Sequence, residues 1–430
     1  MERKITKTMV DWCNQRKRMP LLVYGARQVG KTYAIKAFGE KYFENMVYVN
    51  FEVNKDLAAY FEGSISPRSI CNLLEKYFQI TIKPKSTLIF FDEVQLCERA
   101  LTSLKYFAEE APEYCVVAAG SLLGVALHRE KYSFPVGKVQ FLHAYPLDFE
   151  EFLWAKGQSL LSATIKEHYA SNIPMPEALH RSAINEYYDY LITGGMPAVV
   201  MTHINHSDGG IDESSLKEYI LAAYIADMSK FASASESVKI ANAFASLPVQ
   251  LGKDNKKFKY KLIKRGGRAA FYGEAIDWLL QAAVVLKCGK VTAGMMPLAM
   301  YEDLSSFKLY YNDVGLLAQS IGMTLRGLSL PGNKIFMGAM TENYIAQQLT
   351  SLNHKLYYWT SNGTAEIDFL LTQHDRVIPL ECKAATHVKS KSLDVYCQDY
   401  HPDYSLRVSL RNFGEANNIK SIPLYAVFCL

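Results

Sequence analysis

The chain has 430 residues, of which 49% are hydrophobic and 21% charged, so it can bury more than one core and is not a disordered chain. Its net charge of +4 is too small to indicate a polyanionic partner by itself. The eight cysteines contain no CxxC pair, which argues against a structural zinc site and a dense disulfide framework. No signal peptide and no apolar span of membrane length is found. These features predict a soluble cytoplasmic protein with reduced thiols and no membrane partner.

The first strong motif lies near the N-terminus. The apolar run Pro20–Tyr24 is followed by the octapeptide Gly25-Ala26-Arg27-Gln28-Val29-Gly30-Lys31-Thr32 and then by a helix-compatible segment. This order matches the phosphate-binding P-loop, in which backbone N–H groups and a helix N-terminus surround phosphates. Lys31 is expected to contact the β- and γ-phosphates of ATP, and the Thr32 hydroxyl is expected to bind Mg²⁺. The octapeptide is therefore the predicted nucleotide site.

Five strand-like runs separated by helix-length segments occupy the first third of the chain. Short apolar runs of this kind are typical of a parallel sheet covered by helices on both faces. Ligands of such sheets bind at the carboxyl ends of the strands. The predicted strands are Leu21–Tyr24, Met46–Phe51, Thr87–Phe91, Cys115–Ala119 and Lys138–Leu142.

Polar residues follow two of these runs. Asp92 and Glu93 come directly after the third run. With a P-loop upstream, Asp92 is expected to hold the Mg²⁺ shell, and Glu93 is expected to polarise the water that attacks the γ-phosphate. Ser121 follows the fourth run and has two interpretations. It is a sensor that hydrogen-bonds the attacking water or the γ-phosphate, or an N-cap of the helix that follows.

These motifs resemble those of a group of bacterial and archaeal AAA-type ATP-binding proteins. The resemblance rests on Gly25–Thr32, on Phe91-Asp92-Glu93-Val94-Gln95 and on Ala119-Gly120-Ser121, and its most specific part runs from Phe134 to Phe152. It covers nearly the whole chain. It implies an ATPase domain followed by a C-terminal domain of unknown function with a restriction-endonuclease-like core.

Two cations are candidates for a finger that acts in trans within a homo-oligomer. Members of this family often carry Arg where this chain has Lys138, and Lys supplies charge without the bidentate fork of Arg. Arg129 is the competing candidate. A solvated surface cation is the alternative interpretation of either residue.

The segment from residue 150 to about 198 has a helical pattern. The pattern is interrupted by Ile173-Pro174-Met175-Pro176 and ends at Thr193-Gly194-Gly195-Met196-Pro197. Glycines followed by a proline indicate a helix stop. In related ATPases a similar Gly-x-Pro turn packs against the nucleotide, so Pro197 is also a candidate nucleotide contact. We predict a helical lid over residues 150–214.

Residues 215–310 are predicted to form a winged helix. The expected elements are three helical segments followed by two runs that pair as a β-wing. They are Ser235–Leu247, Lys261–Lys264 and Tyr272–Ala283, then Val284–Lys287 with Lys290–Thr292.

Charge is concentrated within the predicted winged helix. Between residues 253 and 268 eight cations stand against one acid, Asp254. Such a stripe is expected of a protein that binds a phosphate backbone, and a solvated loop is the alternative. The cations are Lys253, Lys256, Lys257, Lys259, Lys261, Lys264, Arg265 and Arg268.

Residues 311–430 carry a set that is typical of restriction-type nucleases. Asp368 lies in a strand-like run, and Glu381 and Lys383 lie two residues apart on the next run, so they share one face of that strand. Asp368 and Glu381 are expected to hold Mg²⁺, while Lys383 orients or deprotonates water and stabilises the phosphorane. Glu342 lies on a helix of the type that supplies a further acid in this fold. Tyr358 and Trp359 are expected to form the preceding strand.

Three interpretations of this set remain open. The acids and the lysine are a salt-bridged strand pair, or an idle site that grips DNA or a partner, or a nuclease site controlled by the ATPase.

The sequence therefore predicts four parts in an α/β architecture: a P-loop AAA-type domain with a parallel sheet (1–149), a helical lid (150–214), a winged helix (215–310) and a restriction-endonuclease-like α/β domain (311–430). The expected function is ATP hydrolysis with Mg²⁺, coupled to a module that acts on DNA or another nucleic acid. One alternative is a metal-dependent nuclease licensed by nucleotide. The other is a signalling or scaffold ATPase that binds protein partners only.

Overall fold

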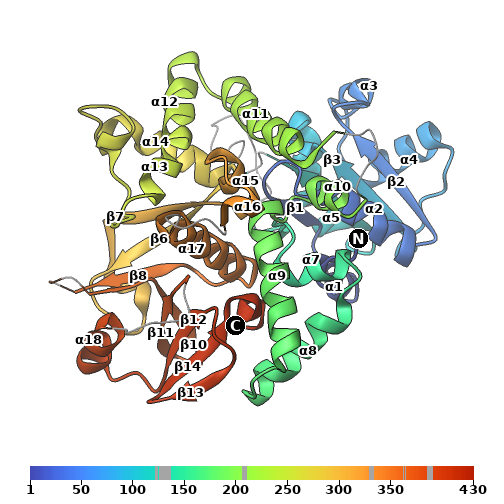
Figure 1. The fold of residues 1–430 in the computed structure, drawn as a ribbon. Helices are drawn as coiled ribbons and strands as arrows, with labels where there is room; N and C mark the ends of the chain where they lie inside the picture. Colours follow the sequence, from blue (N-terminus) through green and yellow to red (C-terminus); the bar gives the residue numbers. More distant parts are fainter. Residues whose placement is uncertain are drawn as a thin grey trace. The chain divides into compact units, whose positions relative to one another are not determined.

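The computed structural model describes residues 1–121, 124, 137–205, 211–328, 334–361, 363, 365–384 and 391–430 (Figure 1). The chain divides into two compact units. The first comprises residues 1–145 and 281–283, and the second comprises residues 146–280 and 284–430. Within the described ranges, no helix combines the length and the apolar character that crossing a bilayer requires.

The first unit is built on a five-stranded sheet in which every strand pair is parallel. The strand order is β2-β3-β4-β1-β5, so β4 lies between β1 and β3. The five predicted strands are confirmed, with ends shifted by no more than two residues. They are β1 (Leu21–Tyr24), β2 (Asn45–Asn50), β3 (Thr87–Asp92), β4 (Cys115–Gly120) and β5 (Gln140–His143).

Helices cover both faces of this sheet, because alternate strand residues point to opposite sides. Val47 and Ile89 belong to a core cluster that also contains residues of α3, α4 and α5. Met46 and Leu88 point to the other face, where they contact Gly39 of α2. The helices are α1 (Lys4–Cys13), α2 (Lys31–Tyr42), α3 (Lys55–Tyr60), α4 (Pro67–Phe78), η1 (Val94–Leu96) and α5 (Glu98–Glu110).

The second unit begins with helices. The helical pattern predicted from residue 150 to about 198 is confirmed, and the interruption at 173–176 lies between α8 and α9. The helices are α7 (Phe149–Ala155), α8 (Ser159–Ser171), α9 (Glu177–Thr193), α10 (Pro197–Asn205), α11 (Glu213–Phe231), α12 (Ala234–Ala245), α13 (Leu247–Leu251), η2 (Tyr260–Leu262) and α14 (Ala269–Gln281).

Two sheets complete the second unit. The first has the order β7-β6-β8-β9, and the helix α17 packs against β6 and β7 (Figure 1). The second has the order β10-β11-β12-β14-β13, in which β11, β12 and β14 are parallel and the outer pairs are antiparallel. The strands are β6 (Val285–Val291), β7 (Glu302–Tyr311), β8 (Tyr357–Thr360), β9 (Glu366–Ile367), β10 (Phe369–Gln373), β11 (Arg376–Cys382), β12 (Ser405–Ser409), β13 (Gly414–Ala416) and β14 (Ile419–Pro423). The helices between and after them are η3 (Leu298–Tyr301), α15 (Val314–Ser320), α16 (Leu325–Leu328), α17 (Lys334–Ser351), α18 (Lys391–Tyr400) and η4 (Leu424–Cys429).

The expected β-wing is wrong. Val284–Lys287 and Lys290–Thr292 do not pair with each other, because β6 runs through both segments and pairs with β7 and β8. Gly289 between them lies where the pairing with β7 shifts register, and a Cβ there would stand 2.6 Å from Glu302 Oε1. The glycine therefore serves a β-bulge with a close neighbour and not a turn. At Lys261–Lys264, expected to be helical or nearly so, the described chain has the 3₁₀ turn η2 and no α-helix.

The sheet β7-β6-β8-β9 also crosses the predicted boundary between residues 310 and 311. Strands β6 and β7 come from the segment predicted to be a winged helix, and β8 and β9 come from the segment predicted to be nuclease-like. Tyr358 and Trp359 do form a strand, as predicted, and it is parallel to β6. The boundary itself falls within β7. The two segments therefore share one sheet instead of forming separate cores.

A cluster of charged side chains joins α9, α10 and α11. His203 Nε2 lies 2.8 Å from Asp189 Oδ2, and His203 Nδ1 lies 2.9 Å from Glu213 Oε1. Lys156 Nζ lies 2.6 Å from the same Asp189 oxygen. Hydrogen bonds to the two carboxylates raise the pKa of His203 from 6.5 to about 9.

We predict that the second unit loses stability as the pH rises from about 6.5 to about 9. The pKa of His203 is higher in the folded chain, so its protonation stabilises the fold fully below pH 6.5, and this contribution is lost as the pH passes through 9. Apparent melting temperatures across this range should show a steeper fall in the wild type than in His203→Gln. His168→Gln, which changes a half-buried histidine of α8 whose ring contacts the Ile173 carbonyl oxygen, should behave as the wild type. Identical pH profiles for the wild type and His203→Gln would contradict the prediction.

Candidate functional site

The strand order of the first unit gathers the predicted nucleotide residues at one edge of the sheet. The P-loop follows β1, Asp92 ends β3 and Ser121 follows β4. Because these strands are parallel, their carboxyl ends lie at the same edge. Strand β4 separates the other two, so Ser121 lies between the P-loop and the acidic pair.

The P-loop backbone has the conformation that its glycines permit. Gly25 has a φ of +147°, and a Cβ there would stand 2.2 Å from the Ala144 carbonyl oxygen. Gly30 has a φ of 86° and is the N-cap of α2, which begins at Lys31. Backbone N–H groups at the start of a helix lack intrahelical acceptors and favour anions. The loop therefore fits the phosphate groups of a nucleotide.

Two cationic side chains hold the P-loop. Lys31 Nζ donates to the carbonyl oxygens of Gly25 (3.0 Å) and Ala26 (2.8 Å), so its ammonium lies within the loop. The buried Arg3 donates from Nη1 to the Val29 carbonyl oxygen at 2.9 Å and from Nη2 to the Tyr145 carbonyl oxygen at 2.7 Å. Arg3 lies far from the motif in sequence, and no local pattern predicts its role.

Thr32 and Asp92 meet as predicted for a shared Mg²⁺ site. Thr32 Oγ1 donates to Asp92 Oδ2 at 2.8 Å, and the Tyr48 hydroxyl donates to the same oxygen at 3.0 Å. Burial raises the pKa of Tyr48 to about 12, so its hydroxyl remains a donor. A hydroxyl and a carboxylate at this separation are ligands that suit a hard divalent cation.

Glu93 is held in a fixed position beside Ser121. Its backbone has a φ of 49°, a left-handed conformation that is uncommon for a side chain of this size. Gln95 Nε2 donates to Glu93 Oε2 at 2.5 Å, and Ser121 Oγ donates to the same oxygen at 3.4 Å. Ser121 therefore lies beside the proposed catalytic acid, and its role as a sensor stays a prediction. The N-cap interpretation concerns residues 122–127, which lie almost wholly outside the described residues. Gln95 lies in the motif Phe91-Asp92-Glu93-Val94-Gln95, but the sequence pattern assigns it no role.

Of the two finger candidates, the structure describes Lys138 and not Arg129. Lys138 Nζ forms a 3.0 Å ion pair with Glu109 Oε1 of its own unit. Arg129 and the run Phe134-Pro135-Val136 lie outside the described residues. The role of either cation in an oligomer stays a prediction.

The glycine–proline turn near residue 195 is the helix stop that was predicted. Helix α9 ends at Thr193 and α10 begins at Pro197. Between them Gly195 N donates to Asp313 Oδ2 at 2.6 Å, and Leu147 N donates to the Gly195 carbonyl oxygen at 2.7 Å. The turn therefore has a structural role inside the second unit, and a contact of Pro197 with nucleotide stays a prediction.

The predicted nuclease-like residues lie in one charged cluster of the second unit. Asp368 stands between β9 and β10, and Asp368 Oδ2 accepts the Cys382 N–H at 2.8 Å. Lys383 Nζ lies 3.1 Å from Glu381 Oε1 on β11. Burial, and after it the charge of Glu342, raise the pKa of Asp368 to about 7.

Two further lysines belong to this cluster. Glu342 on α17 is ion-paired with Lys256, lies 3.5 Å from Lys308 Nζ and accepts the Tyr310 hydroxyl at 3.1 Å. Lys308 is 1% exposed and also lies 2.5 Å from Glu366 Oε1. Burial alone would raise the pKa of Glu342, but Lys308 and Lys256 lower it to about 2. In the sequence, Lys308 is the single charged residue of the run 307–311, whose other members are aromatic or apolar. This pattern could have indicated a buried lysine.

Over the described part of the chain, no group of three or more His, Cys, Asp or Glu side chains is placed to hold one metal ion. The oxygens of Glu342 accept from lysine and tyrosine donors. The Mg²⁺ site expected on the pair Asp368 and Glu381 stays a prediction. Without Glu342, the predicted nuclease-like set is reduced to Asp368, Glu381 and Lys383.

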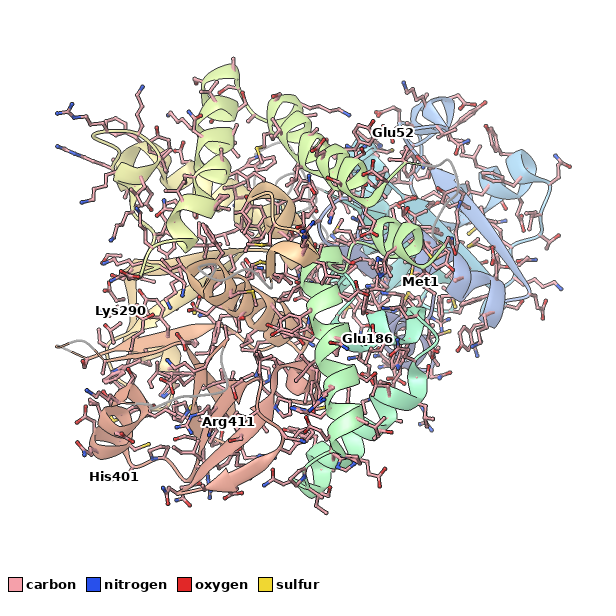
Figure 2. All side chains as sticks on the ribbon, viewed as in Figure 1. Met1, Glu52, Glu186, Lys290, His401 and Arg411 are labelled. Atoms are coloured by element: carbon pink, nitrogen blue, oxygen red, sulfur yellow. The ribbon has the colours of Figure 1, made fainter. Side chains whose placement is uncertain are left out.

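The predicted basic stripe is mostly exposed, and Figure 2 shows nitrogen-tipped side chains extending outward around this part of the second unit. Lys256 is the exception that contacts Glu342, and its side chain is 15% exposed. Lys257 and Lys259 are half-buried too, and the exposed members are Lys253, Lys261, Lys264, Arg265 and Arg268.

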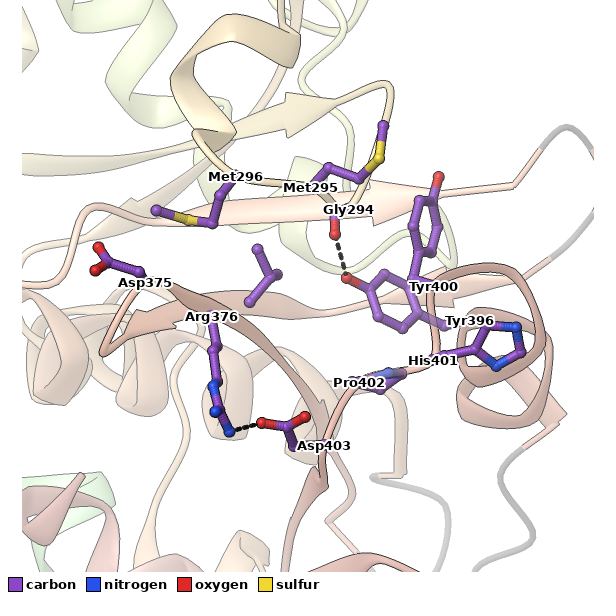
Figure 3. Close-up of a pocket in the computed structure, with 11 residues that line it drawn as sticks. Gly294, Met295, Met296, Asp375, Arg376, Tyr396, Tyr400, His401, Pro402 and Asp403 are labelled. Atoms are coloured by element: carbon purple, nitrogen blue, oxygen red, sulfur yellow. Dashed lines mark hydrogen bonds and ion pairs between the residues drawn. The ribbon is translucent and has the colours of Figure 1, made fainter.

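A cavity of about 360 Å³ lies elsewhere in the second unit, beside α18 and the β10–β11 turn (Figure 3). Tyr396 and Tyr400 line it, and the Tyr396 hydroxyl donates to the Gly294 carbonyl oxygen at 3.2 Å. Arg376 forms an ion pair with Asp403 at its rim. None of the predicted site residues lines this cavity.

Comparison with protein families assigns the N-terminal region. Residues 17–153 match the model described as an AAA domain. Together with the parallel sheet and the P-loop, this match makes the N-terminal region an AAA-type P-loop ATPase domain. Residues 184–326 and 337–427 match two models described as domains of unknown function, DUF8612 and DUF4143. Neither description names a winged helix or a nuclease fold. The nuclease fold stays a prediction, and the winged helix is not confirmed, since its expected wing is wrong. No curated protein matches the chain.

Solved structures give more distant likenesses. The Walker-type ATPase PABY2304 of Pyrococcus abyssi is 14% identical, with a TM-score of 0.44, over 74% of this chain and 95% of that chain. The ORC2 protein of Aeropyrum pernix, in ADPNP and ADP complexes, is 12% identical, with a TM-score of 0.36, over 74% and 93%. AMPPCP-bound DnaA from Aquifex aeolicus is 12% identical, with a TM-score of 0.28, over 64% and 86%. TM-scores below 0.5 do not establish a shared fold over the aligned lengths.

We predict that Gly25→Ala destabilises the first unit and abolishes nucleotide binding. The new Cβ would collide with the Ala144 carbonyl oxygen, and the positive φ would be strained. Urea denaturation should show an unfolding free energy lower by about 2 kcal/mol. The matched change Gly63→Ala, whose Cβ would meet the Tyr60 carbonyl oxygen at an ordinary 3.5 Å, should leave both properties near the wild type. Unchanged stability and binding in Gly25→Ala would refute this account of the loop.

Proposed function

We propose that this chain hydrolyses ATP with Mg²⁺ and that its nucleotide state controls a second unit acting on nucleic acid. The observation that carries the ATPase part is the convergence of the P-loop and the acidic pair. Thr32 lies 2.8 Å from Asp92, and Ser121 lies 3.4 Å from Glu93.

Each residue of this site has a proposed task. The backbone of Gly25–Thr32 binds the β- and γ-phosphates, and Lys31 compensates their charge. Thr32 and Asp92 would hold Mg²⁺, which supplies charge stabilisation of the transferring phosphoryl group.

The carboxylate of Glu93 orients the attacking water and accepts its proton. Gln95 and Ser121 keep that carboxylate in place through their hydrogen bonds. The fixed backbone of Glu93 adds to this positioning.

The exposed cations between residues 253 and 268 support a nucleic-acid partner. Five of them lie on the surface with little opposing charge in the same segment. Phosphate backbones bind such surfaces through displacement of counterions. A scaffold that binds only protein partners is the alternative. In a homo-oligomer Arg129 and Lys138 are the proposed fingers, and Lys138 would have to leave Glu109 to act in trans.

We predict that Lys31→Ala abolishes ATP binding, because it removes the cation within the phosphate loop. Glu93→Gln should still bind ATP but hydrolyse it about 10²–10³-fold more slowly, since the amide cannot accept the proton of water. Binding of a fluorescent ATP analogue and release of phosphate measure the two effects.

Lys41→Ala changes an exposed lysine at the far end of α2 and serves as the control. Wild-type hydrolysis in Glu93→Gln would remove Glu93 from the proposed role. Wild-type binding in Lys31→Ala would remove the P-loop assignment.

A metal-dependent nuclease is a second candidate function. The contact of Lys383 with Glu381, close to the half-buried Asp368, favours it. Glu342 has its oxygens occupied by lysine and tyrosine donors, so no catalytic step is assigned to it.

If the second candidate is right, the protein should cut plasmid DNA with Mg²⁺ or Mn²⁺, and ATP should change the rate. Glu381→Ala should abolish cleavage while ATP hydrolysis persists. Agarose gels of plasmid incubated with each metal, with and without ATP, provide the measurement. An intact plasmid under every condition, or equal cleavage by Glu381→Ala, would count against a nuclease.

A further inference from the structure

We propose that Lys256 is a latch that nucleic acid opens. In the structure Glu342 holds the Lys256 ammonium inside the second unit, and phosphate groups bound on the surrounding basic segment (residues 253–268) compete for it. This inference rests on the proposed action on nucleic acid.

The basic segment is anchored on β7 next to Lys256. Phe258 N donates to the Phe307 carbonyl oxygen at 2.8 Å, and the two rings stack with centroids 5.4 Å apart. Lys256 lies two residues before Phe258, so in an extended stretch both side chains point to the same side. Phe258 is 5% exposed, and Lys256 points inward with it to reach α17.

Of the two lysines beside Glu342, Lys256 is the one that can move away from its carboxylate. Lys308 is fully buried on β7 and contacts both Glu342 and Glu366. With Lys308 and the Tyr310 hydroxyl in place, Glu342 keeps charge-compensating partners when Lys256 departs. Lys256 stands in a loop outside regular secondary structure, and its side chain is already 15% exposed, so no helix or strand has to break for it to turn toward solvent.

The exposed cations near Lys256 would bring phosphate groups close to it, and these phosphates compete with Glu342 for the Lys256 ammonium. Lys253 precedes it in the loop, and Lys261, Lys264 and Arg265 follow it. A phosphate backbone on these side chains attracts the Lys256 ammonium away from Glu342. Because coupling is reciprocal, bound nucleic acid loosens the latch, and a broken latch strengthens the binding of nucleic acid.

The experiment measures binding of a fluorescent DNA duplex by anisotropy over a range of salt concentrations. Glu342→Gln should bind about fivefold more tightly at low salt, with a salt slope steeper by about one, because Lys256 becomes an additional phosphate contact. The double variant Glu342→Gln/Lys256→Gln should lose this gain. The matched double variant Glu342→Gln/Lys257→Gln should keep it.

A second measurement does not depend on Glu342. Hydrogen exchange of the amides at residues 253–262 in the full chain should be about tenfold faster in Lys256→Gln than in the wild type, and Lys257→Gln should leave it unchanged. DNA added to the wild type should accelerate the same amides. If Glu342→Gln fails to fold, this measurement decides, and unchanged exchange in Lys256→Gln overturns the proposal.

The outcomes distinguish failure of the latch from failure of the proposed nucleic-acid function on which the latch rests. DNA binding that weakens in Lys261→Glu/Lys264→Glu but does not strengthen in Glu342→Gln overturns the latch alone. A gain that persists in Glu342→Gln/Lys256→Gln also overturns it. Absence of DNA binding in the wild type and in every variant overturns both the latch and the nucleic-acid part of the proposed function, while ATP hydrolysis would still stand.

Discussion

Parallel pairing of β1, β4 and β3 is the constraint on which the nucleotide site depends. These strands are buried on both faces, so their polar side chains lie at or beyond the strand ends, as Thr87 and Asp92 do in β3. Since all three end at one edge, the P-loop, Ser121 and Glu93 meet although long helical segments separate them in the chain. The bond between Thr32 and Asp92 joins the outer two strand ends, and the contact of Ser121 with Glu93 joins the central one.

The parts of this site that sequence could predict are those encoded locally. A strand, a glycine loop and a helix follow one another within Leu21–Tyr42, and Asp92 directly ends an apolar strand. The side chains that support them arrive from elsewhere: Arg3 from α1's N-cap and Tyr48 from β2. A spacing pattern cannot reveal such partners, because only the folded sheet brings them close.

The second unit shows the same limit more strongly. The hairpin of β10 and β11, with Glu381 and Lys383 two residues apart, follows from strand alternation. The β-wing failed because Gly289, next to a register shift in the middle of β6, has the sequence appearance of a turn. The sequence did not predict that the Lys256 side chain points inward, for a different reason. Its neighbours are surface cations, and only the anchored Phe258 and the position of Glu342 distinguish it.

The sheet shared by β6, β7, β8 and β9 has a consequence for how such chains diversify. Its strands come from two segments that match separate families of unknown function, so the central pairing of β6 with β8 forms only when both segments are present. Lys308 on β7 draws its counter-charges from Glu342 and Glu366, which belong to the later segment. Exchange of the later segment for one that lacks these carboxylates would leave a buried ammonium without its counter-charges, a cost of several kcal/mol. The two segments are therefore expected to be inherited as a pair.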